Sequence, residues 1–312
     1  MAESKKQNAT VSPNLSACRQ CRFQDLQINS LYKIILLIFF ISCFNKAQIY
    51  SDKDVEICNS KFDFAVEKNF SEKPIGDVIA EIGKSFLGTD YEAFAIEKEG
   101  EERLVINLTG LDCTTFLENA VVFSRLIKKG KSSFKDYQDE LVYLRYRDGI
   151  INQYPSRLHY FLDWIYNNVK KGIVEDVTKD IGGEIISFNV SYMSTHPETY
   201  LHLKGNPSFI PVIAGQEKEI SSRTYYYIPE EIIAAVEDQI NNGDVIAFTT
   251  NIKGLDISHV GIAVKEDDGR IHLLHAPQVG SKVQVSEKPL SEYVKCVKKH
   301  TGIVVLRAFE PL

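Results

Sequence analysis

The sequence predicts an α+β fold in which helices come first and an antiparallel sheet comes last. Three observations lead to this prediction. Helical periodicity runs through most of residues 74–169, short β-branched runs separated by turns fill residues 245–309, and the two kinds of segment do not alternate. Such separation is typical of α+β proteins rather than of βαβ proteins with a parallel sheet.

The composition is that of an ordinary globular protein. The chain has 312 residues, of which 44% are hydrophobic and 25% are charged, and its formal net charge is -6. This length is sufficient for a sizeable core, and residues 49–312 are expected to form one domain with a helical and loop insertion at about 130–240. No long basic run is present, so nucleic acid is not an expected partner.

Residues 1–48 do not show the pattern of a folded domain and are interpreted as a signal or pre-sequence. Residues 34–44 are almost wholly apolar but shorter than the roughly 20 residues that span a bilayer, and they follow Lys33. A basic segment, an apolar segment and a small-residue exit form the layout of a secretory signal. We therefore expect a bacterial protein that is exported, either periplasmic or an outer-membrane lipoprotein. Ile41-Ser42-Cys43 resembles a lipoprotein box in which Cys43 would carry the lipid, the only membrane anchor expected.

The cysteines do not form a recognisable disulfide or metal framework. Cys18 and Cys21 make a lone CxxC within the pre-sequence, without a second pair of ligands. Cys58, Cys113 and Cys296 belong to the mature region, and three cysteines cannot all pair with one another. A Cys58–Cys296 disulfide is conceivable, and at least one thiol then stays free unless it pairs between chains.

The first part of the mature chain is expected to be mainly helical. Periodicity predicts helices over residues 74–86, 113–127, 135–147 and 156–169, and the run 103–108 predicts a strand. Residues 172–228 carry several prolines and are interpreted as inserted loops with a short helix near 191–203. The tyrosine run 225–227 is expected to serve packing, although exposed aromatic rings could also line a sugar groove.

The last part of the mature chain is expected to be mainly β. Short apolar or β-branched runs predict strands over residues 245–250, 260–264, 271–275, 282–285 and 303–309, and the second and third of these are expected to form a hairpin. Short helices are expected at 230–240 and 290–299. An antiparallel sheet packed on the earlier helices follows from this order.

Cys113 stands at the start of a predicted helix. Asp112 is a favourable N-cap residue, so the cysteine falls in the first turn, beside unpaired backbone N–H groups and the positive end of the helix dipole. Both features favour a thiolate, which is a nucleophile. The alternative interpretation is that Cys113 is a small core residue that continues the apolar stripe.

Two histidines are expected to meet beside this helix. His259 opens one strand of the predicted hairpin and His275 closes the next, so both lie at the same edge of the sheet. One imidazole could then act as a base while the other orients it, which with Cys113 would make a Cys–His–His triad. Taken singly, each histidine is more often a surface or hydrogen-bonded core residue.

Four motifs together resemble the NlpC-type peptidoglycan cysteine peptidases. They are Asp112-Cys113-Thr114, residues 243–248, residues 259–262, and Leu274-His275-Ala276. The resemblance implies a papain-like fold, with Cys113 as nucleophile, His259 as general base and His275 as the third polar residue. It also implies that Tyr91 lies near the oxyanion site, and that neither a metal nor another cofactor is needed.

The long interval between Cys113 and His259, together with residues 156–164, resembles the N-acetylmuramoyl-L-alanine amidase-like branch. The resemblance implies that Arg157 and His159 face the substrate cleft, where Arg157 could pair with a stem-peptide carboxylate. His159 has an equal alternative as a packed, hydrogen-bonded core residue. The implied substrate is peptidoglycan or a muropeptide, and the oligomeric state is not predicted.

Several functions remain open at this point. The leading hypothesis is a secreted amidase that cleaves a stem-peptide amide bond by the thiol mechanism, and the alternative of the same mechanism is a γ-D-glutamyl-diamino acid endopeptidase. A zinc amidase with His259, His275 and Cys113 as ligands is a weaker hypothesis, because no HExxH motif is present. A non-catalytic wall-binding protein on the same fold is the hypothesis from another class.

Overall fold

The computed structural model describes residues 48–279 and 281–312, and residues 48–312 belong to one compact unit. The predicted pre-sequence, with Cys43 and the CxxC pair, lies outside the described residues apart from its last residue. No helix in the described part of the chain combines the length and the apolar character needed to cross a bilayer.

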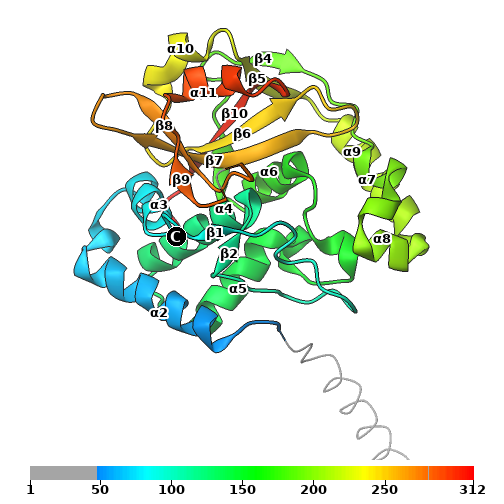
Figure 1. Ribbon diagram of the computed structural model, residues 1–312, viewed down its shortest axis with the longest axis horizontal. Coiled ribbons are helices and arrows are strands. Elements are labelled where there is room, and N and C mark those ends of the chain that lie inside the picture. Colours follow the sequence, from blue (N-terminus) through cyan, green and yellow to red (C-terminus); the bar gives the residue numbers. More distant parts are fainter. Residues whose placement is uncertain (1–47, 280) are drawn as a thin grey trace, which may run out of the picture. The chain divides into compact units, whose positions relative to one another are not determined.

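An antiparallel sheet of eight strands lies at the centre of this unit (Figure 1). Both faces of its middle strands are covered, since nearly every residue of these strands is buried. The antiparallel sheet that the sequence predicts is therefore confirmed. Across the sheet the strands are β4 (Glu184–Ile186), β5 (Tyr225–Pro229), β10 (His300–Ala308), β6 (Val245–Thr250), β7 (Ile257–Lys265), β8 (Ile271–His275) and β9 (Gln284–Val285), and β3 (Val174–Asp176) pairs with another part of β10.

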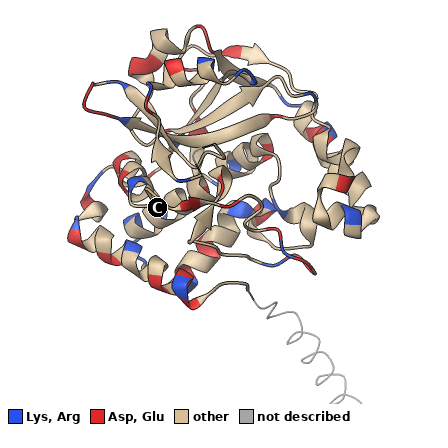
Figure 2. Ribbon diagram, in the orientation of Figure 1, with Lys and Arg blue, Asp and Glu red and all other residues tan. Residues whose placement is uncertain are grey.

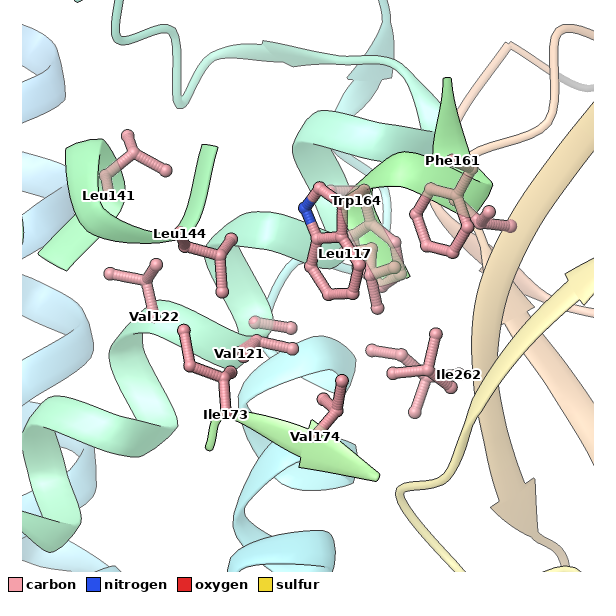
Figure 3. Close-up of a cluster of buried hydrophobic side chains, with 14 of the residues drawn as sticks. Leu117, Val121, Val122, Leu141, Leu144, Phe161, Trp164, Ile173, Val174 and Ile262 are labelled. Atoms are coloured by element: carbon pink, nitrogen blue, oxygen red, sulfur yellow. The ribbon is translucent and has the colours of Figure 1, made fainter. Parts of the chain in front are cut away.

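The larger helical layer packs on one face of the sheet. Leu117 and Val121 of the central helix meet Trp164 and the strand residue Ile262 in one apolar cluster (Figure 3). Phe161 stacks on Trp164 with ring centroids 4.9 Å apart. The helices of this layer are α2 (Asp52–Glu67), α3 (Ile75–Lys84), α4 (Cys113–Lys128), α5 (Phe134–Arg145) and α6 (Phe161–Lys170), of which α3, α4 and α5 confirm three predicted helices.

Two short helices, α10 (Ile233–Val236) and α11 (Leu290–Cys296), cover the opposite face. Strand alternation separates the two cores, because Ile262 faces α4 while Ala263 contributes to the cluster under α10 and α11. Charged side chains are rare on the middle strands, whereas acidic and basic residues alternate along the outer helix α2 (Figure 2). This distribution is that of a sheet buried between two layers.

The region 130–240 is more regular than the sequence suggests. It contains α7 (Tyr192–Thr195), α8 (Leu201–Gly205) and the regular helix α9 (Ile210–Ser221), which the sequence analysis missed. Pro211 is compatible with α9 because it occupies the first turn, where its missing N–H is not needed. The tyrosine run is part of β5, and β3, β4 and β5 all join the sheet.

The strand predicted over residues 103–108 is wrong. The segment is buried, but its single ladder contact is a bridge between Val105 and Ile49, and the Leu108 N–H donates to the Asp54 carboxylate at 2.7 Å. Its apolar residues therefore reflect burial in a loop. The strand that leads to Cys113 is the short β2 (Gly110–Leu111), which pairs in parallel with β1 (Asp90–Tyr91).

The helix predicted over residues 156–169 begins later, at Phe161. Tyr154–Ser156 is a single 3₁₀ turn, and the chain is then extended up to the helix. The start of α6 is fixed from far along the chain, because the Asp256 carboxylate accepts the Leu162 N–H at 2.8 Å.

The disulfide considered between Cys58 and Cys296 is not formed. Cys58 is buried within the helical layer, whereas Cys296 is exposed at the end of α11, on the other side of the sheet. Both residues are free thiols. Burial raises the pKa of Cys58 to about 12, so this thiol is protonated and poorly reactive.

Candidate active site

Cys113 is the first residue of α4, as the sequence predicts. The Asp112 carboxylate accepts the backbone N–H of Thr115 at 2.8 Å, and the Thr115 hydroxyl accepts the backbone N–H of Asp112 at 2.9 Å. This reciprocal capping box holds the first turn of the helix. The Cys113 thiol is half-buried, and its Sγ lies 4.0 Å from Thr114 Oγ1.

His259 and His275 meet as the predicted hairpin requires. The β7–β8 register pairs Ile262 with Leu274, which places His275 opposite Gly261. From there His275 reaches diagonally to His259, and the distance between His259 Nε2 and His275 Nδ1 is 2.7 Å. A Cβ atom at Gly261 would lie only 3.1 Å from the His275 Cβ, so glycine leaves the space in which the pair forms.

Cys113 and His259 line one cavity of about 430 Å³. The start of α4 and the start of β7 line it, together with residues between 154 and 161, residues between 193 and 201, and Phe94 and Glu97 of the loop between β1 and β2. No hydrogen bond joins the Cys113 thiol to either histidine of the described chain. Such bonds are often long in unliganded enzymes and shorten when substrate binds.

The protonation of Cys113 differs from the expectation. Burial raises the pKa of the thiol to about 11, and the Asp112 carboxylate acts in the same direction. The backbone N–H groups of Val260 and Thr114 favour the thiolate but do not outweigh these effects. The helix start therefore holds a neutral thiol, which needs a base to become a nucleophile.

The two histidines are also neutral. Burial lowers the pKa of His259 well below 6.5, and the neighbouring imidazole of His275 adds to the effect. Burial likewise lowers the pKa of His275 to about 4. If His259 Nε2 donates its proton to His275 Nδ1, the other nitrogen of His259 is an unprotonated acceptor, which is the form that a general base requires.

Tyr91 ends β1 and lies close to the nucleophile. Burial, together with the negative charges of a Cys113 thiolate and of Asp112, raises the pKa of its phenol to about 12. The phenol is therefore protonated at neutral pH and can donate a hydrogen bond. This placement is compatible with the expected contact to an oxyanion.

Arg157 is not placed to bind a stem-peptide carboxylate. Its guanidinium is buried, with Nη1 2.8 Å from Glu97 Oε1 and Nε 3.2 Å from Glu102 Oε1. The resemblance implied a role in the substrate cleft, but Arg157 does not line the cavity, and its guanidinium faces the carboxylates of Glu97 and Glu102. The two carboxylates already satisfy its charge, so its role in this structure is to hold the loop that carries Glu97.

His159 lines the cavity, in an extended segment rather than in the predicted helix. Its Nε2 lies 2.9 Å from the backbone oxygen of Tyr154. Burial lowers the pKa of His159 well below 6.5, so the ring is neutral, and the carbonyl requires the proton on Nε2. Nδ1 is then a hydrogen-bond acceptor.

His300 was missed by the sequence analysis. It stacks on Phe248 at 4.5 Å between ring centroids, behind His259, and both of its ring nitrogens are buried without a hydrogen-bond partner. Tyr293 of α11 packs edge-on against His275 in the same cluster. The sequence placed His300 between a predicted helix and a predicted strand, and its neighbours depend on the β6–β10 pairing.

The described residues contain no group of three or more His, Cys, Asp or Glu side chains arranged to hold a metal ion. His259, His275 and Cys113, the ligands of the zinc hypothesis, are among these described residues and do not form such a group.

A family model described as AmiA-like, N-acetylmuramoyl-L-alanine amidase-like matches residues 81–303. The chain belongs to this amidase-like family. The match runs from α3 into β10 and so includes Cys113, His259 and His275.

Solved structures place the amidase-like chain among similar folds. An N-acetylmuramoyl-L-alanine amidase from Bacteroides uniformis ATCC 8492 is 38% identical, with a TM-score of 0.72, over 75% of this chain and 99% of that one. A candidate xylanase from Bacteroides fragilis is 42% identical, with a TM-score of 0.68, over 72% and 98%. Protein LPG0564 from Legionella pneumophila, of the DUF1460 family model, shares the fold alone at 20% identity and a TM-score of 0.62, over 83% and 97%. Comparison with curated proteins gives no match.

Proposed function

We propose that this member of the amidase-like family is a cysteine amidase that hydrolyses the amide bond between N-acetylmuramic acid and L-alanine in peptidoglycan. The observation that carries the proposal is the single cavity shared by Cys113 and His259, with His259 held by His275 at 2.7 Å. The family and the Bacteroides uniformis amidase support the substrate class.

The reaction begins with a neutral thiol and a neutral imidazole. As Cys113 Sγ attacks the amide carbonyl carbon, its proton passes to the free nitrogen of His259, and His275 stabilises the imidazolium that forms. Negative charge develops on the carbonyl oxygen. The backbone N–H of Cys113 at the helix start and the Tyr91 hydroxyl are the donors available to it.

The intermediate then breaks down in two steps. His259 gives its proton to the leaving amine of L-alanine, and the C–N bond breaks to leave a thioester on Cys113. A water molecule next transfers a proton to His259 and attacks the thioester, and the returning proton releases the Cys113 thiol and the carboxylic acid. No oxidant, reductant or metal enters this scheme.

The proposal includes two further points that derive from the sequence. The fold of residues 49–312 is of the papain-like, NlpC type, in which a nucleophile helix packs on an antiparallel sheet. Residues 1–48 direct export to the periplasm or, through Cys43, to the outer membrane.

Mass spectrometry of muropeptides incubated with the purified protein tests the function. Wild type should release an intact stem peptide and a free lactyl carboxylate, whereas Cys113→Ala should release neither. Cys296→Ala is the matched control, because that exposed thiol lies outside the cavity and should be dispensable.

Each other outcome has a distinct meaning. A sugar-linked dipeptide product would assign the endopeptidase reaction to the same thiol. Cleavage by Cys113→Ala at the wild-type rate would overturn the thiol mechanism. Binding without cleavage by every variant, across several stem types, would support the wall-binding hypothesis.

A further inference from the structure

The histidine pair uses only one side of the His275 ring. Its Nδ1 lies 2.7 Å from His259 Nε2, whereas its Nε2 is buried and has no hydrogen-bond partner in the described chain. A buried polar atom without a partner is rare in folded proteins, because burial removes the hydrogen bonds that water would make. The Nε2 side of His275 therefore has a role that the proposed reaction does not yet use.

The position of the His275 proton decides whether His259 can act as a base. A neutral imidazole carries one N–H, on either Nδ1 or Nε2. With the proton on Nδ1, His275 donates to His259 Nε2, so His259 carries its own proton on its other nitrogen and has no site for the thiol proton. With the proton on Nε2, His275 accepts from His259, and the other nitrogen of His259 is free. An acceptor for the His275 Nε2–H therefore favours the form of the pair that catalysis needs.

His300 belongs to the same buried cluster and is not used by the proposed reaction. Its ring is buried, and both of its nitrogens lack a hydrogen-bond partner in the described chain. It stacks on Phe248 at 4.5 Å between ring centroids, and Phe248 lies 5.8 Å from the His259 ring. On the other side, Tyr293 lies 5.2 Å from His275 and 6.3 Å from His300. The three histidines thus share two aromatic neighbours.

The electrostatics of the cluster agree with this proximity. A positive charge on His300 acts to lower the pKa of both His275 and His259, so its ring lies within electrostatic range of both. Burial lowers the pKa of His300 to about 4, so the ring is neutral at pH 7. A neutral imidazole keeps one unprotonated nitrogen, which is a hydrogen-bond acceptor.

His275 and His300 therefore have complementary requirements. His275 Nε2–H needs an acceptor, and His300 offers one. No direct hydrogen bond joins the two rings in the described chain. Buried polar groups that are close but not in direct contact are commonly joined by an internal water molecule, which can accept from one group and donate to the other.

We propose that His300 is a positioning residue for the histidine pair, and that one buried water molecule accepts from His275 Nε2–H and donates to His300. The inference rests on the proposed function and adds His300 to the row Cys113, His259 and His275. When His259 takes the thiol proton, His275 Nδ1 continues to accept from His259 Nε2, and the hydrogen-bonded row stabilises the positive charge. No proton leaves the row. His300 does not line the cavity, so it acts only through His275.

His300→Phe keeps a ring against Phe248 and removes the acceptor. On a muropeptide its kcat should fall about tenfold, the effect of one lost hydrogen bond, while KM stays unchanged. Asparagine and glutamine place an amide oxygen near the position of Nδ1 and of Nε2, respectively. Either His300→Asn or His300→Gln should therefore recover most of the loss in kcat. His196→Phe is the control, because His196 is exposed and does not line the cavity, and it should keep the wild-type kcat.

Nitrogen-15 NMR of the histidine rings separates this inference from the proposed function, because it requires no turnover. In the Cys113→Ala protein the His275 proton should be on Nε2, and His300→Phe in the same background should move a large fraction of it to Nδ1. An unchanged His275 tautomer would overturn the inference, whatever happens to kcat. A changed tautomer with wild-type kcat would equally refute a role in positioning the pair. A changed tautomer in a protein whose wild type cleaves no muropeptide would leave His300 as the positioning residue and overturn the reaction.

Discussion

Gly261→Ala tests whether the absence of a side chain at this position of β7 is needed for His275 to reach His259. A Cβ atom there would lie 2.7 Å from Leu273 Cδ1, 2.9 Å from the Leu274 oxygen and 3.1 Å from the His275 Cβ. The end of the Leu273 side chain can rotate away. The backbone oxygen and the His275 Cβ can give way only if β8 moves, so the strain is transmitted to His275.

The size of the effect follows from two opposing contributions. Overpacking a core costs about 1–3 kcal/mol, while replacing glycine by alanine returns about 0.4–1 kcal/mol through the unfolded chain. Gly261 does not have a left-handed backbone, so alanine can adopt its conformation. We expect the free energy of unfolding to fall by about 1–2 kcal/mol.

The catalytic effect should be larger than the stability effect. A shift of β8 lengthens the 2.7 Å bond between His259 and His275, and a misplacement of about 1 Å can cost roughly 100-fold in rate. Gly261 does not line the cavity, so substrate binding should change little. We expect kcat to fall about 10- to 100-fold at nearly constant KM.

Steady-state kinetics on a muropeptide and denaturant unfolding measure both quantities. Gly215→Ala in α9 is the control, because its Cβ atom would meet nothing within 4 Å and should leave kcat unchanged. A Gly261→Ala variant with wild-type kcat would refute the reasoning. It would mean that His275 is placed by other contacts, or that the bond to His259 is not needed.

Two further predictions concern buried charge and protonation. Arg145 Nε lies 2.7 Å from Glu118 Oε2, and both side chains are almost fully buried. Arg145→Met should therefore lower the free energy of unfolding by about 3–5 kcal/mol, measured in urea at pH 7.5, and the additional change Glu118→Leu should recover most of this loss. A double variant as unstable as the single one would contradict this account. Burial lowers the pKa of His300 to about 4, so folded His300 stays neutral while the unfolded residue binds a proton below pH 6.5. As pH falls from 6.5 to 4, the free energy of unfolding of wild type should therefore decrease by up to about 3 kcal/mol more than that of His300→Phe. An equal pH dependence of the two melting curves would disprove this prediction.

The sequence predicts elements well where local signals are sufficient. The N-cap at Asp112 and the hairpin formed by β7 and β8 depend on residues a few positions apart, and both predictions are confirmed. The predicted strands between residues 245 and 309 also form the middle of the sheet, whereas β3, β4 and β5 lie among the helices of the preceding region, where no strands were predicted. Residues 103–108 show the limit, since a run of apolar residues describes burial equally well in a strand and in a loop.

In the candidate site, too, local features could be predicted from the sequence and features that depend on distant contacts could not. His259 and His275 could be placed together from the strand pattern, because their meeting depends on one hairpin. The sequence could not show that Phe94 lines the cavity, because its place there depends on a backbone angle and on α8 lying at the same cavity. Arg157 was assigned to substrate, but its partners are carboxylates more than 50 positions away in the sequence.

The sequence by itself determined that a cysteine begins a capped helix and that two histidines share one edge of a hairpin. Hydrogen bonds between residues close in the chain specify both features. Only the tertiary structure decided that the thiol is protonated and that the two histidines are neutral, because burial sets these pKa values. It also decided where α6 starts, since its cap comes from Asp256, on a segment that is adjacent only after the sheet has formed.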